Sequence, residues 1–166
     1  MTLMSKKTLT PSILSLVASG IQVKGSKRFV ADKTSIKEAN IGWTGSNFDR
    51  FFLDKVEEDI GDATIAIHRL EKSSVDAPIR KELGENREET KLVHLFDLIR
   101  KQSEGQQGHL LVNGYANVAY IRGKDGNLRV VNARWYSNDR YWSVDASSVE
   151  NPREWLHGDH VLSSDC

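Results

Sequence analysis

The stretch from Ala116 to Ala146 most constrains what this chain can fold into, because apolar and other side chains alternate along three segments separated by turn residues. Asp125-Gly126 is a dipeptide that favours a tight hairpin, and Asn138-Asp139 tolerates the same geometry less well. Two-residue loops at both dipeptides predict an antiparallel β-meander of three strands, over about 116–146.

The two short loops also predict the register of the meander, with Trp135 opposite Trp142 and Ile121 opposite Val130. In this register one face is apolar along all three strands, which is typical of a face that packs on the rest of a core. That face consists of Ala116, Val118, Tyr120, Val131, Ala133, Trp135, Trp142, Val144 and Ala146.

The opposite face of the meander mixes polar and aromatic side chains and is the predicted binding surface. Its candidate binding residues are Asn117, Asn132, Arg134, Tyr136, Tyr141 and Asp145. Such groups on rigid strands suit recognition of a protein or of a polar ligand. Two alternatives stay open. The face is either solvated, with Arg134 and Asp145 as a cross-strand pair, or covered by the N-terminal segment.

Two amphipathic helices are predicted to pack against the apolar face of the meander. The first spans about 46–59, with an apolar stripe at helical spacing. The second spans about 87–104, where acids precede a wide apolar arc and basic residues follow it. The stripe of the first helix is Phe48, Phe51, Phe52, Val56 and Ile60, and the arc of the second is Leu92, Val93, Leu95, Phe96, Leu98 and Ile99.

The remaining segments complete a predicted α+β domain. Residues 64–70 and 109–112 read as strands that are candidates to extend the sheet. A helix is predicted over 11–20, and a shorter one from Asp76 to Gly84. We expect a flexible basic tail over 1–10 and a single domain over 11–166.

Charge is balanced in total but unevenly placed. The sequence contains 23 basic and 23 acidic residues, so nucleic acid is an improbable partner and anionic membrane is not indicated. Residues 1–45 carry a net charge of +5, from seven Lys or Arg and two acids. Residues 46–62 carry −4, from two basic residues and six acids. We expect these two stretches to neutralise each other in the fold.

Cysteine content and hydropathy indicate the cellular compartment that is expected for the protein. Cys166 is the only cysteine, so an internal disulfide cannot form and a reducing, cytoplasmic compartment is expected. No apolar run approaches the roughly 20 residues that cross a bilayer.

The densest group of metal-ligating residue types is His157, Asp159 and His160. Imidazole and carboxylate groups suit zinc or another divalent ion, but a site needs three or four protein ligands and no second cluster accompanies these. A nucleophile elbow and the glycine-rich phosphate motifs are absent from the sequence. No cofactor is therefore expected.

These observations favour a non-catalytic binding protein that recognises a protein partner or a small polar ligand through the outer face of the C-terminal sheet. The alternative is a small metal-dependent hydrolase that uses His157, Asp159 and His160. A homo-oligomer stays open.

Overall fold

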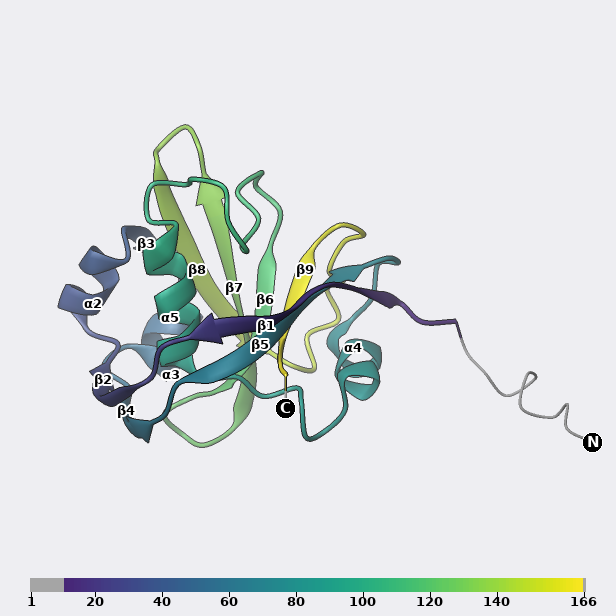
Figure 1. The fold of residues 1–166 in the computed structure, drawn as a ribbon, viewed down its shortest axis with the longest axis horizontal. Coiled ribbons are helices and arrows are strands. Elements are labelled where there is room, and N and C mark those ends of the chain that lie inside the picture. The colour runs from purple at the N-terminus through teal and green to yellow at the C-terminus, as the bar shows by residue number, and fades with distance from the viewer. Residues whose placement is uncertain (1–10, 166) are drawn as a thin grey trace, which may run out of the picture.

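The computed structural model describes residues 11–165 and contains a seven-stranded mixed sheet, a two-stranded sheet and four helices (Figure 1). The elements in chain order are β1 (Leu14–Val23), β2 (Ser26–Val30), α2 (Lys33–Glu38), β3 (Ile41–Thr44), α3 (Ser46–Phe52), β4 (Val56–Ile60), β5 (Ala63–Leu70), α4 (Asp76–Leu83), α5 (Leu92–Lys101), β6 (Asn117–Arg122), β7 (Leu128–Tyr136), β8 (Tyr141–Ser148) and β9 (His160–Ser164). The large sheet has the order β1-β5-β9-β6-β7-β8-β3, and β2 pairs with β4. The tail predicted over 1–10 lies outside the described residues.

The meander forms as β6, β7 and β8, and its second hairpin has the predicted register. Trp135 pairs with Trp142, and Ala133 pairs with Val144. The two indole rings meet edge to face, with centroids 5.6 Å apart and an interplanar angle of 65°. Such a pair contributes about 0.5–1.5 kcal/mol beyond its burial.

The register of the first hairpin was predicted wrongly. Tyr120, rather than Ile121, pairs with Val130, and the connection is the loop 123–127 instead of a two-residue turn at Asp125-Gly126. A slip of one residue exchanges the faces of a strand. Ala119 and Ile121 therefore face the same side as Val131, whereas Val118 and Tyr120 face the other. Strand β6 is buried on both sides, so apolar and polar residues do not alternate along it. Its sequence therefore does not indicate which side chains face which side of the sheet.

Each face of the large sheet borders its own hydrophobic core. On one side, buried side chains of α5 and α3 form a cluster with Ile65, Ile67, Ala119, Ile121 and the apolar face of β7 and β8. On the other side, α4 contributes to a smaller cluster, composed of Leu14, Leu70, Ile79, Leu83, Ala116, Val118, Tyr120, Val130 and Val161. The smaller core lies over β5, β9 and β6, and it reaches β7 at Val130 and the partly buried Leu128, near the start of that strand.

The helix predicted over 46–59 ends at Phe52, and the rest of that prediction is wrong. Leu53 is extended, Asp54 has a φ of 67°, and the chain continues as β4. Strand β4 pairs with the basic β2, so that Arg28 lies opposite Glu58. The basic and acidic stretches therefore lie side by side, and the Lys24 ammonium is 3.6 Å from the Asp62 carboxylate. The acids that follow α3 belong to a strand and not to a helix end.

Helix α5 spans Leu92–Lys101, shorter at both ends than the predicted 87–104, and its first turn is capped from outside. The Glu57 carboxylate accepts hydrogen bonds from the backbone N–H groups of Leu92 and Val93, at 3.0 and 2.9 Å. The Lys55 ammonium lies 2.9 Å from the same carboxylate. The first N–H groups of a helix have no intrahelical partner, so Glu57 satisfies two buried donors and joins the small sheet to the core.

The strand predicted over 109–112 does not form, because side-chain amides replace its backbone partners. The Gln102 amide donates to the carbonyl of Leu110 at 3.0 Å and accepts from its N–H at 2.8 Å. The Asn117 amide bonds the N–H and carbonyl of Leu111 in the same way, at 2.8 and 3.1 Å. The two amides therefore form the hydrogen bonds with the backbone N–H and carbonyl groups of this loop that a neighbouring strand would otherwise form.

The N-terminal segment also departs from expectation, whereas two other predicted elements form. Residues 14–23 form β1, not the helix predicted over 11–20, and pair with β5, the strand predicted over 64–70. The short helix that starts at Asp76 forms as α4. Strand β9, near the C-terminus, lies between β5 and β6 in the middle of the sheet (Figure 1).

Ending the chain at Asp159 removes β9 and tests this arrangement. Because β9 joins β5 to β6, we expect the truncated protein to lose its cooperative thermal transition and its near-ultraviolet circular dichroism. Ending the chain at Asp165 removes Cys166 alone and serves as the control. A cooperative transition at the control's midpoint would contradict the role of β9.

Replacement of Glu57 by Ala should lower the free energy of unfolding by roughly 2–4 kcal/mol, because two buried N–H donors lose their acceptor and the Lys55 ammonium loses its carboxylate partner. Urea denaturation measures the change. Glu58→Ala, on the exposed side of the same strand, should alter stability by less than about 0.5 kcal/mol. Equal effects of the two substitutions would show that the cap does not stabilise α5.

Candidate functional site

The part of the sheet that neither α4 nor the segment after β8 covers carries most of the predicted binding residues. We call this surface the open face and define it by Trp43, Asn132, Arg134, Tyr136, Tyr141 and Asp145. The side chains of Trp43 and Tyr136 are 49% and 43% exposed. The described N-terminal residues, 11–45, supply an edge strand beside this face, and they leave these two rings accessible.

The confirmed register of β7 and β8 brings the predicted residues together. Asn132 pairs with Asp145, and Tyr136 pairs with Tyr141. The two phenol rings have centroids 6.2 Å apart at an angle of 50°. Arg134 pairs with the buried Ser143, so its guanidinium projects between the aromatic end and the polar end of the face.

Sequence reasoning missed Trp43, which joins the open face through a bulge in β3. Ile41 pairs with Trp142 and Trp43 pairs with Ser143, so two steps along β3 match one step along β8. A bulge turns consecutive side chains to the same side. Because β3 is a parallel strand from a distant part of the sequence, no local pattern indicates this contact.

Two glycines allow the aromatic and acidic groups of the open face to lie against β3. A Cβ atom at Gly42 would overlap the ring of Tyr141, and one at Gly45 would overlap the carboxylate of Asp145. Both positions therefore need glycine for close packing and not for an unusual φ.

Arg134 has no hydrogen-bond or ion-pair partner within residues 11–165. The alternative of a cross-strand pair with Asp145 is thus not seen: an Asp145 oxygen accepts from the N–H of Ala146 at 2.8 Å instead. A half-buried guanidinium without a partner keeps its five donors available for a ligand.

Asn117 does not belong to the open face. The register slip of β6 places it on the opposite side of the sheet, where it is fully buried. Its amide bonds Leu111 and donates to the carbonyl of Ala133 at 3.2 Å. These bonds hold the loop before β6, and they account for a polar residue in the middle of a core.

The three predicted metal ligands lie on one loop and strand but are engaged differently. The Asp159 carboxylate is buried and accepts from the N–H groups of Ala116 and Leu156, at 3.0 and 2.8 Å. The exposed His157 lies 3.5 Å from the Glu71 carboxylate. Nδ1 of His160 is buried and has no protein partner. No group of three or more His, Cys, Asp or Glu side chains within residues 11–165 is arranged to hold a metal, so the metal alternative gains no support there.

A histidine–serine pair that sequence reasoning also missed lies on the α4 side of the sheet. Nε2 of His68 is 3.0 Å from Oγ of Ser163. Burial lowers the pKa of His68, and Arg87 acts in the same direction, whereas Glu82 and Asp165 oppose the shift. Ser163 is only 2% exposed, so a substrate would not reach its hydroxyl, and the contact is a cross-strand bond in the sheet.

The lowered pKa of His68 predicts a pH dependence of stability. The native state binds fewer protons than the unfolded chain, so the free energy of unfolding should fall as pH drops through about 6.5, the value for an unfolded histidine. His68→Gln should show a smaller loss than wild type when urea denaturation is compared at about pH 7.5 and about pH 5.5.

His109→Gln, at an exposed position, provides the control and should keep the wild-type pH dependence. An unchanged pH dependence in His68→Gln would show that burial of this ring does not affect proton binding. Burial also lowers the pKa of His160, so part of the wild-type dependence should persist in the variant.

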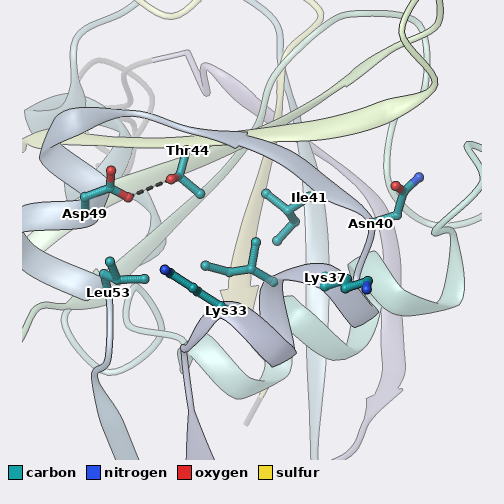
Figure 2. A pocket seen from close by; sticks show the side chains of 8 residues that line it. Lys33, Lys37, Asn40, Ile41, Thr44, Asp49 and Leu53 are labelled. Atoms are coloured by element: carbon teal, nitrogen blue, oxygen red, sulfur yellow. Dashed lines mark hydrogen bonds between the residues drawn. The ribbon is translucent and has the colours of Figure 1, made fainter.

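A cleft of about 450 Å³ lies on the other side of β3, between this strand, α2 and α3 (Figure 2). We call it the edge cleft. Its apolar lining is Ile36, Ile41 and Leu53, and its polar lining is Lys33, Lys37, Asn40, Thr44 and Asp49. Asp49 accepts a hydrogen bond from Oγ1 of Thr44 at 2.6 Å, and Asn40 donates to the carbonyls of Ser103 and Arg140. The ammonium groups of both lysines are without a carboxylate partner within residues 11–165.

Comparison with models of protein families, with curated proteins and with solved structures gave no match. The described helices are all too short or too polar to cross a membrane. Function therefore has to be argued from the site alone.

Proposed function

We propose that this chain is a non-catalytic binding domain that recognises a protein partner through the open face. The observation that carries the proposal is the guanidinium of Arg134, which lacks a partner in the described chain and lies on a sheet face with two exposed aromatic rings. Trp, Tyr and Arg are the residues most enriched among those that dominate binding energy at protein interfaces.

The strands that carry the open face hold its side chains rigidly, which favours binding of a partner. Arg134 and Tyr136 alternate with Ala133 and Trp135, which are buried on the α5 side. The neighbouring strand fixes Tyr141 against Gly42. Side chains held in this way lose little conformational entropy when a partner binds, so more of the contact energy appears as affinity.

The chemistry of the open face suits contact with a protein better than catalysis. Its groups are an indole, two phenols, a guanidinium, an amide and one carboxylate, and the carboxylate lies against Gly45. A guanidinium beside aromatic rings can bind a carboxylate or a backbone carbonyl while the rings bury apolar surface. We place this interaction in the cytoplasm, since a single cysteine cannot form an internal disulfide.

A photo-crosslinking amino acid in place of Tyr136 tests the proposal in cells that express the protein. We expect a discrete crosslinked species from this position and none from Val17, an exposed residue of β1 at the opposite edge of the sheet. Adding Arg134→Ala should reduce the yield by about tenfold or more, as expected when an interface hot spot is truncated.

Thermal unfolding of Arg134→Ala should match wild type within about 0.5 kcal/mol, because this side chain has no hydrogen-bond or ion-pair partner within residues 11–165. Equal crosslinking from positions 136 and 17, or an undiminished yield with Arg134→Ala, would contradict the proposal. A crosslinked species that contains two copies of this chain would mean that the open face is a dimer interface.

A further inference from the structure

We propose that the edge cleft receives acidic side chains of an extended segment that lies along β3. The inference rests on the proposed function, because the segment belongs to the partner that contacts the open face. It adds the chemical character of that partner: an extended stretch in which acidic residues alternate with apolar ones.

Strand β3 is accessible along one edge. Within residues 11–165 it is the last strand of the large sheet and pairs with β8 alone. Gly42 and Trp43 are exposed, and no turn, loop or cap hydrogen bond from the described chain uses the backbone of residues 41–44. An edge strand presents N–H and carbonyl groups to which an extended segment can pair.

The two sides of β3 carry different surfaces. Ile41 and Thr44 face the edge cleft, while Gly42 and Trp43 face the open face. Side chains of an extended segment alternate between opposite sides with a period of two. A segment beside β3 therefore directs alternate residues into the edge cleft and toward Trp43.

The charge of the edge cleft selects acidic residues. Lys33 and Lys37 are one turn apart on α2 and have no ion-pair partner in the described chain, and Figure 2 shows Lys33 extending toward Leu53. The lone acid, Asp49, already accepts the hydroxyl hydrogen of Thr44. Carboxylates entering the cleft meet two ammonium groups above an apolar floor, which also suits the stem of Glu.

Residues of the segment that point away from the edge cleft, toward Trp43, are expected to be apolar. Trp43 is 49% exposed, and Gly42, its neighbour in the chain, lies against the ring of Tyr141. An apolar or aromatic side chain at every second position would bury part of these rings. The two preferences together distinguish this segment from a uniformly acidic one.

Two fluorescent peptides of about ten residues test the inference by fluorescence anisotropy. In the first, Glu alternates with Val or Tyr; in the second, the same residues are arranged with all Glu consecutive. We expect the alternating peptide to bind at low salt and the blocked peptide to bind at least about tenfold more weakly.

The double variant Lys33→Ala/Lys37→Ala should weaken binding of the alternating peptide by about tenfold and flatten its salt dependence. Lys72→Ala/Lys81→Ala removes the same charge from exposed lysines outside the cleft and should leave affinity unchanged. Matching thermal midpoints for all variants exclude misfolding as the cause.

Several results would overturn the inference. They are no binding of the alternating peptide, equal binding of the blocked peptide, or full binding by Lys33→Ala/Lys37→Ala. If this variant still crosslinks its partner from position 136, the proposed function stands while the inference fails. If the cleft variant abolishes a concentration-dependent dimer, or if a single-stranded oligonucleotide displaces the peptide, the occupant is a second copy or nucleic acid instead.

Discussion

The pairing of β9 with both of its neighbours is the interaction on which the rest of the structure depends. The large sheet consists of β1 and β5 on one side and a four-stranded unit on the other, and in the described part of the chain only β9 joins them. Asp159 bonds to both sides of this junction. Its carboxylate accepts from the N–H of Ala116, just before β6, and its backbone carbonyl accepts from the N–H of Leu70, in β5, at 2.9 Å. Asp159, one of the three predicted metal ligands, thus aligns the strands, and its burial agrees with that role.

Those parts of the fold that rest on local signals could be predicted from the sequence. The hairpin of β7 and β8, the strand β5, the helix α4 and the interior of α5 all follow from alternation, caps or apolar stripes within a few residues. The failures share a different cause. Residues 14–23 and 56–60 become strands because distant strands pair with them, and residues 109–112 remain a loop because Gln102 and Asn117 bond their backbone. Tertiary partners override propensity at these places.

The same division explains which residues of the candidate site could be anticipated. Asn132, Arg134, Tyr136, Tyr141 and Asp145 share one face because a single local hairpin sets their register. Asn117 depends on the neighbouring hairpin, where a longer loop shifts the register by one residue and reverses its face. Trp43 and the edge cleft depend on a parallel strand from another part of the chain, which no pattern near position 142 reveals.

The unequal covering of the two sheet faces is the physical reason to regard the open face as a binding surface. On the α5 side, apolar residues of β7 and β8 all lie in the larger core. On the α4 side, the smaller core includes Val130 but none of the residues that follow it on β7. The uncovered half nevertheless keeps exposed aromatic rings and a guanidinium without a partner in the described chain. A face that only had to be solvated could carry small polar groups at these positions, whereas a face that binds a partner gains from large ones.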